Sequence, residues 1–221
     1  MKAWLHENRV LIGLLLTFGL VRGAIAGYNP VPSGSMHPSL LEGDVVLVNH
    51  LAYDAKLPFT HLALARLGEP ERGEIVVFDS PDDGKLLIKR LVGLPGDTIE
   101  MRDKRLFING IPARYETIGA VIDSTAGHDR AATEMRETFG DSSRVIRWLP
   151  IRHDADDFGP ITIPADHYLM LGDNRDNSRD SRYIGLVPRR LLVGRAERVL
   201  ISADIEGNWL PRFGRFGQRL N

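Results

Sequence analysis

Short runs of branched apolar residues, separated by Gly, Pro or Asp, dominate the chain after residue 40. They cover residues 43–48, 73–80, 86–93, 97–101 and 105–110. β-Branched side chains suit the half-buried surface of a sheet, the separating residues favour turns, and Asn109-Gly110 is a strong hairpin signal. Similar runs return at 159–173 and 189–202, and no long amphipathic helix or internal repeat interrupts the pattern. The sequence therefore predicts a mostly β protein with an antiparallel sheet.

One stretch departs from this pattern. From about residue 112 to 160 the chain is polar, as in STAGHDRAATEMRETFGDSS, and has few apolar positions. High polarity without apolar periodicity argues against a strand of the main sheet, so we expect a polar insertion here. At 221 residues, the chain has room for one domain that carries such an insertion.

The N-terminal segment contains an uncharged apolar run, Val10–Val21, which follows Lys2 and Arg9. As a helix this run would span ~18 Å, which is short of the ~30 Å hydrocarbon core of a bilayer. The basic residues before it favour a cytoplasmic N-terminus. The bulk of the chain is therefore expected to be exported.

The residues of this segment leave two interpretations open. The segment fits a cleaved secretory signal, because Ala24-Ile25-Ala26 has the small-x-small form of a cleavage site. It also fits a retained anchor whose helix continues to about Tyr28, which would extend it to ~28 Å. Arg22 would then reach toward the outer headgroups, where an Arg costs less than the ~3 kcal/mol expected at the bilayer centre.

Composition and motifs exclude several classes of protein. The formal net charge of −1 gives no basic field for nucleic acid, and the absence of Cys removes disulfides, thiol nucleophiles and iron–sulfur clusters. HExxH, G-x-S-x-G, Walker and dinucleotide-binding motifs are absent from the sequence. Residues 173–181 suggest a calcium loop, but Arg175, Ser178 and Ile184 stand where that loop needs a ligand, a turn Gly and a bidentate Glu. No metal or cofactor is predicted.

Ser33 and Ser35 stand two residues apart in VPSGSMHPSL, with a Gly between them. His37 follows closely, but a Ser-His-Asp triad is recognised by three-dimensional geometry, and we expect His37 to face solvent or lie in a loop. A serine can instead be activated by a neutral lysine. Deprotonating a free lysine at pH 7 costs about 4.6 kcal/mol, and burial can lower the lysine pKa by ~3–5 units.

Lys89 is the candidate base. It lies inside the apolar run LLIKRLVG, with Leu87, Leu91 and Gly93 on its own face of the predicted strand. A buried lysine without an acidic partner is rare unless it serves a function. In the alternative, which periodicity alone slightly favours, Lys89 lies on the solvent face beside an equally unexplained Arg90.

Four sequence blocks together resemble a known family. PSGSM is followed by LLEGDVVLV, then by KRLVGLPGD and then by GDNRDNSRDSRYIGLVP. In order and spacing they are similar to the conserved boxes of the bacterial type I signal peptidases, also called leader peptidases. The resemblance covers Val31–Asp97 and Pro164–Pro188, and it implies the signal-peptidase-like antiparallel sheet fold behind one N-terminal transmembrane helix.

The resemblance also implies roles for particular residues. Ser35 would be the nucleophile and Lys89 the general base, with the backbone N–H of Ser35 and the hydroxyl of Ser33 as the oxyanion hole. Supporting residues would hydrogen-bond the lysine ammonium or form an ion pair behind the site, and others would line the pockets for Ala at −1 and −3. The supporting residues are Ser178, Asp180 and Arg182, and the pocket residues are Val31, Pro32 and Ile88.

We therefore expect a cytoplasmic tail over residues 1–9, a single transmembrane anchor over 10–28 and an extracytoplasmic catalytic domain over 29–221. The predicted function is that of a membrane-bound serine endopeptidase of the cytoplasmic membrane. It would remove signal peptides from exported preproteins by cleaving after Ala-x-Ala sites. The expected partners are preproteins and the phospholipid membrane, without nucleic acid, and the sequence predicts no oligomeric state.

Rival functions make different demands on the sequence. A specialised Ser–Lys processing protease, such as one that matures a conjugation pilin, shares this scaffold and would differ in substrate. A self-cleaving repressor would carry a DNA-binding helix-turn-helix where this chain is apolar. A non-catalytic membrane-tethered binding module would not need Ser33, Ser35 and Lys89 together.

The C-terminal tail, NWLPRFGRFGQRLN, interleaves aromatic and Arg residues. One interpretation is a frayed end that packs a single aromatic side chain. The other is a patch that rests on an anionic membrane surface. The residues concerned are Trp209, Phe213, Phe216, Arg212, Arg215 and Arg219.

Overall fold

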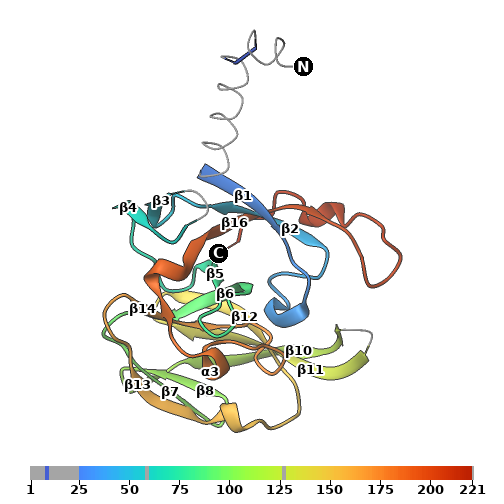
Figure 1. Ribbon diagram of the computed structural model, residues 1–221. Coiled ribbons are helices and arrows are strands. Elements are labelled where there is room, and N and C mark those ends of the chain that lie inside the picture. Colours follow the sequence, from blue (N-terminus) through green and yellow to red (C-terminus); the bar gives the residue numbers. More distant parts are fainter. Residues whose placement is uncertain (1–7, 10–24, 58–59, 126–127, 221) are drawn as a thin grey trace.

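The computed structural model in Figure 1 describes residues 8–9, 25–57, 60–125 and 128–220. Most of the expected anchor, residues 10–24, lies outside them. Within the described ranges, no helix is long and apolar enough to cross a bilayer. The expectation that the helix continues to about Tyr28 is wrong, because Ala26–Pro30 form strand β1. These residues pair with Val45–Asn49 of the next strand, and this pairing satisfies their backbone groups in a sheet.

The protein is mostly β, as predicted. Its largest sheet has seven strands in the order β1-β2-β16-β5-β6-β14-β15, and each neighbouring pair is antiparallel. Apart from β1, its strands are β2 (Asp44–Asn49), β5 (Ile75–Asp79), β6 (Leu86–Gly93), β14 (His167–Leu171), β15 (Val187–Pro188) and β16 (Leu192–Ser202). The apolar runs at 43–48, 73–80, 86–93 and 189–202 therefore correspond to strands of this sheet, whereas those at 97–101 and 105–110 form strands of a smaller sheet.

Two smaller sheets and several short helical turns complete the frame. The four-stranded sheet has the order β13-β7-β8-β9, and the two-stranded sheet pairs β3 with β4. Asn109 and Gly110 have positive φ angles of 54° and 77°, which confirms the predicted turn between β8 and β9. These strands are β3 (Asp54–Lys56), β4 (Ala63–Arg66), β7 (Thr98–Arg102), β8 (Arg105–Ile108), β9 (Ile111–Pro112) and β13 (Phe158–Thr162). The helical turns are η1 (Gly34–Met36), η2 (Asp154–Asp156), α3 (Ser181–Ile184), η3 (Arg189–Leu191) and η4 (Phe213–Arg215).

The predicted insertion forms a sheet of its own. It contains β10 (Arg114–Thr125), β11 (His128–Phe139) and β12 (Ser142–Trp148), in that order. These long strands were not predicted from the sequence, because buried ion pairs replace apolar side chains on part of the buried face of this sheet. Glu137 Oε2 accepts hydrogen bonds from Arg144 Nε at 2.7 Å and from Arg175 Nη2 at 2.6 Å. In Figure 1 the β10–β11 hairpin reaches below the blue segment that carries η1.

The C-terminal tail is not frayed. Val199 N–H donates to Gln218 O at 2.9 Å, which holds the tail along β16. Arg215 forms an ion pair with the buried Asp44 at 2.6 Å, and Arg212 pairs with Asp204 at 2.8 Å. Two of the arginines expected on a membrane patch therefore serve internal contacts instead.

Candidate active site

Ser35 lies in a short turn that is anchored in the core. The turn η1 is closed by a hydrogen bond from His37 N–H to Gly34 O at 3.1 Å and is followed by one from Leu40 N–H to Met36 O at 3.0 Å. Met36 and Leu40 are fully buried in a cluster with residues of β2, β5 and β16. This apolar contact fixes the turn, so the backbone around Ser35 is held in one place.

Lys89 reaches Ser35 from the middle of the main sheet. It lies on β6, between β5 and β14, and pairs with Val76. Its Nζ donates a hydrogen bond to Ser35 Oγ at 2.5 Å. The alternative that Lys89 faces solvent is wrong, because the residue is only 3% exposed. The structure thus brings together the two groups that the sequence singled out, although they are far apart in the chain.

The surroundings of Lys89 favour its neutral form. Burial lowers the pKa of its ammonium group from 10.5 to about 8, against the opposing charges of Asp180 and Asp173, and Arg182 lowers it further. A lysine with this pKa is about one-tenth neutral at pH 7 and about half neutral at pH 8. It can therefore accept a proton from a serine hydroxyl near neutral pH.

Arg90, the neighbour of Lys89, has a structural partner. Its Nε and Nη2 donate to the two carboxylate oxygens of Asp173 at 2.8 and 2.7 Å, and both residues are buried. Its Nη1 donates to Gly73 O at 2.6 Å. The two basic residues therefore differ in role, because Arg90 has a compensating carboxylate and Lys89 has a hydroxyl.

Asp173→Asn is expected to destabilise the protein by about 3–5 kcal/mol, because it leaves the buried charge of Arg90 without its carboxylate. Urea unfolding of the variant and the wild type at pH 7 measures the difference. The control is Asp83→Asn, which removes a solvent-exposed partner of Lys85 and should change stability little. Equal stability of the Asp173 variant and the wild type would contradict this assignment.

Ser33 and Ser178 both lie beside Ser35. Ser33 directly precedes η1 without a capping hydrogen bond from its side chain, and its hydroxyl lies 3.4 Å from Ser35 Oγ. A Cβ atom at Gly172 would come within 2.2 Å of Ser178 Oγ and 2.5 Å of Ser35 O, so only glycine fits between them. The expected hydrogen bond between Ser178 Oγ and Lys89 Nζ is not formed in the described part of the chain.

Asp180 and Arg182 form the predicted ion pair. Arg182 Nε and Nη2 donate to the two carboxylate oxygens of Asp180 at 2.8 Å each. Asp180 also accepts the N–H of Gly172 at 3.0 Å and caps helix α3. The pair therefore ties the segment after β14 to the strand end beside Ser35.

The predicted pocket residues differ in their surroundings. Val31 is 2% exposed and belongs to the core cluster, with little surface left for a substrate. Pro32 is exposed, and Ile88 is half-buried against the same cluster. Pro32 and Ile88 therefore remain the better candidates for substrate contact.

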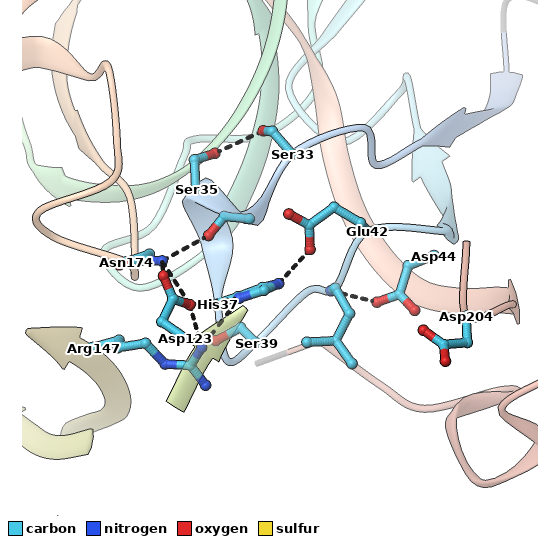
Figure 2. Close-up of polar contacts among 12 residues, drawn as sticks. Ser33, Ser35, His37, Ser39, Glu42, Asp44, Asp123, Arg147, Asn174 and Asp204 are labelled. Atoms are coloured by element: carbon cyan, nitrogen blue, oxygen red, sulfur yellow. Dashed lines mark hydrogen bonds and ion pairs between the residues drawn. The ribbon is translucent and has the colours of Figure 1, made fainter. Parts of the chain in front are cut away.

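A charged cluster behind Ser35 was missed by the sequence reasoning. His37 lies in the loop after η1, as one part of the expectation had it, but it does not face solvent, because it is buried between Glu42 and Asp123 (Figure 2). Arg147 joins the cluster from β12, and Asn174 from the segment after β14. The only signal in the sequence was the unusual number of charged residues in the insertion.

Comparison with known proteins agrees with this geometry. Residues 2–201 match the family model described as signal peptidase, peptidase S26. The chain belongs to this signal peptidase family. It is 40% identical to a signal peptidase I of Pseudomonas aeruginosa over 200 residues, which cover 85% of this chain and 69% of the relative. Signal peptidase I P of Bacillus subtilis subsp. natto is 34% identical over 201 residues, which cover 88% of this chain and 87% of the relative.

The family assignment identifies the chain as a serine peptidase and confirms the resemblance seen in the four sequence blocks. The insertion sheet lies inside the matched range, so it is part of the matched peptidase region. No group of three or more His, Cys, Asp or Glu side chains suited to a metal ion occurs in the described ranges.

Proposed function

We propose that this chain is a membrane-bound serine endopeptidase that removes N-terminal signal peptides from exported preproteins with a Ser35–Lys89 dyad. The observation that carries this proposal is the 2.5 Å contact between Ser35 Oγ and the Nζ of a buried lysine. Membership of the signal peptidase family supplies the substrate class. Relatives named Signal peptidase I favour this general function over a specialised pilin-processing protease.

In the acylation step, neutral Lys89 takes the proton of Ser35 Oγ while the oxygen attacks the scissile carbonyl carbon. The tetrahedral intermediate collapses when its C–N bond breaks, and the protonated Lys89 returns the proton to the departing amine of the mature protein. The signal peptide is then an ester on Ser35. Water attacks this ester as it gives a proton to Lys89. When the ester C–O bond breaks, protonated Lys89 returns the proton to Ser35 Oγ, and the signal peptide leaves as a carboxylic acid.

The oxyanion of each intermediate needs a hydrogen-bond donor. The hydroxyl of Ser33 lies beside Ser35 Oγ and can turn toward a carbonyl oxygen bound there. Ser33→Ala is therefore expected to lower kcat by about 10²–10³-fold. Steady-state cleavage of a preprotein at pH 8 measures the loss. Ser143→Ala, which changes an exposed serine on β12, is the control with unchanged kcat.

We also propose that the described domain rests on the outer face of the cytoplasmic membrane. Two exposed apolar groups lie in the part of the molecule where the chain emerges at residue 25, on either side of β1 in Figure 1. The β3–β4 hairpin carries one group, and the C-terminal segment carries the other. Large apolar surfaces of this kind mark contact sites for lipid or protein. Their members are Leu62, Leu64, Leu67, Trp209, Leu210 and Phe213.

The test of function is cleavage of a preprotein with an Ala-x-Ala site by the full chain in detergent. Mass spectrometry of the products should place the cut after the −1 Ala. A matched substrate with Phe at −1 should resist cleavage, because the proposed site accepts a small side chain there. Absence of cleavage, or cutting of both substrates at the same rate, would refute the proposed activity or its specificity, respectively.

A further inference from the structure

His37 is enclosed between the loop that carries Ser35 and the insertion sheet. The residue is 6% exposed, and both ring nitrogens face carboxylates (Figure 2). Its Nε2 lies 2.5 Å from Glu42 Oε2, and its Nδ1 lies 3.1 Å from Asp123 Oδ1. A neutral imidazole has one N–H and can donate to only one of these groups. Two facing carboxylates therefore suit the doubly protonated ring.

The charges around His37 are of both signs: the carboxylates favour an imidazolium, and Arg147 opposes it. The groups that face it are Glu42 on its own loop, Asp123 on β10 and Arg147 on β12, whose Nη1 lies 3.1 Å from Nδ1. Arg147 is shared, since its Nη2 donates to Glu134 of β11 at 2.8 Å. Two carboxylates, Asp123 and Glu134, thus contact this guanidinium, and the Glu42 carboxylate contacts the ring of His37 instead. Burial lowers the pKa of His37, but hydrogen bonds to Asp123 and Glu42 outweigh burial and raise it from 6.5 to about 9, while Arg147 opposes the rise.

The same cluster is connected to the backbone of the nucleophile. The side-chain amide of Asn174 donates to Gly34 O at 3.1 Å and lies 3.3 Å from Asp123 Oδ2. Its backbone N–H donates to Ser35 O at 3.1 Å. His37 itself closes the turn η1 through its N–H. Asp123 therefore reaches the Ser35 turn by two routes, one through His37 and one through Asn174.

We propose that the imidazolium of His37 is a positioning group for the nucleophile. By holding Glu42 and Asp123 together, it fixes the Ser35 turn against the insertion sheet and keeps Ser35 Oγ within reach of Lys89 Nζ. The proposal rests on the proposed function, because this positioning matters only if Ser35 attacks the substrate. It gives the insertion a role in catalysis, although the residues that the structure describes there make no hydrogen bond to Ser35 Oγ or Lys89 Nζ.

The kinetic test compares wild type with His37→Gln from pH 7 to pH 10.5. Near pH 8 the variant should show a kcat about 10–100-fold lower with little change in KM. A displaced Ser35 slows the chemical step, whereas the contacts that bind the substrate remain. Above pH 9 the wild-type ring loses its proton as well, so the ratio of the two rates should fall toward one. A ratio that stays constant across this range would indicate a merely structural role and overturn the proposal.

Two further variants sharpen this comparison. Glu42→Gln removes one of the two carboxylates that face His37 and keeps the side-chain shape. The His37 ring should then lose its proton at a lower pH, so kcat should begin to fall at a lower pH than in the wild type. His61→Gln changes an exposed histidine between β3 and β4, and its rate should match wild type at every pH. If His37→Gln does not fold, the Glu42→Gln variant decides the proposal. A fall of kcat at a lower pH than in the wild type supports it, and an unchanged pH profile of kcat overturns it.

A titration by NMR separates this proposal from the proposed function. In ¹⁵N-histidine-labelled full chain, the two ring nitrogens of His37 should both remain protonated to near pH 9, with Glu42→Gln lowering the midpoint. A midpoint near 6.5 would overturn the proposal even if the enzyme is active. Conversely, failure of the wild type to cleave preprotein would refute the proposed function, while the titration would still report the state of His37.

Discussion

Ser35→Ala is expected to lower kcat for preprotein cleavage by about 10⁴-fold or more, because it removes the hydroxyl to which Lys89 Nζ is hydrogen-bonded. Alanine fits the buried turn without a new contact, so the folded structure and substrate binding should persist. In other serine proteases, removal of the serine nucleophile lowers kcat by a factor of this size.

Single-turnover cleavage with excess enzyme measures the loss without interference from product release. Equal circular dichroism spectra and equal binding of an uncleaved preprotein would show that the Ser35 variant is folded. Cleavage by the variant at a rate near that of wild type would show that Ser35 is not the nucleophile. Loss of both cleavage and binding would indicate misfolding instead.

Lys89→Met is expected to abolish cleavage and, at the same time, to stabilise the protein. Met has a similar unbranched shape and no charge, so it removes the general base and the cost of burying an ammonium group. The folded-state pKa of Lys89 is about 8, below the 10.5 of an unperturbed lysine. This difference means that the charged form of Lys89 costs the wild type about 3 kcal/mol of stability at pH 7, a cost that the Met variant avoids.

The stability gain of Lys89→Met depends on pH, because folding lowers the pKa of Lys89. Between pH 8 and pH 10.5 the unfolded wild type binds more protons at Lys89 than the folded protein, so wild-type stability rises with pH in this window. The advantage of Lys89→Met should therefore be largest at or below pH 7 and should shrink toward pH 10.5. Urea unfolding at pH 7, 9 and 10.5 measures it.

Lys85→Met is the control for the Lys89 experiment. Lys85 is exposed at the turn between β5 and β6, so its replacement should leave activity and the pH dependence of stability unchanged. A Lys89→Met protein that is less stable than wild type at pH 7 would show that the lysine contributes net favourable contacts. Retained cleavage by Lys89→Met would exclude its role as the base.

The sequence by itself determined the strands of the main sheet and the identity of the Ser–Lys pair. Both are local properties. Runs of apolar β-branched residues between Gly and Pro predict strands wherever they occur. The Ser–Lys pair was identified by the resemblance of four short sequence blocks to a known family, because periodicity alone left Lys89 on either face of its strand. The ion pair of Asp180 with Arg182 was predicted from the resemblance to the signal peptidase family, and the structure forms it.

Only the tertiary structure decided which polar residues are buried. Lys89 and Arg90 look equivalent in sequence, yet one meets Ser35 and the other meets Asp173, which is 83 residues away. His37 is buried because Asp123, 86 residues further along the chain, reaches it from the insertion.

The physical reason is that burial of a charge is tolerable only when a partner compensates it. Apolar periodicity reports which positions avoid water, but it carries no information about which distant group will neutralise a charge. Ion pairs fill part of the buried face of the insertion sheet. Its strands could therefore not be predicted from the pattern of apolar side chains. The dyad was readable from the chain, whereas the charged frame that holds it exists only in the folded protein.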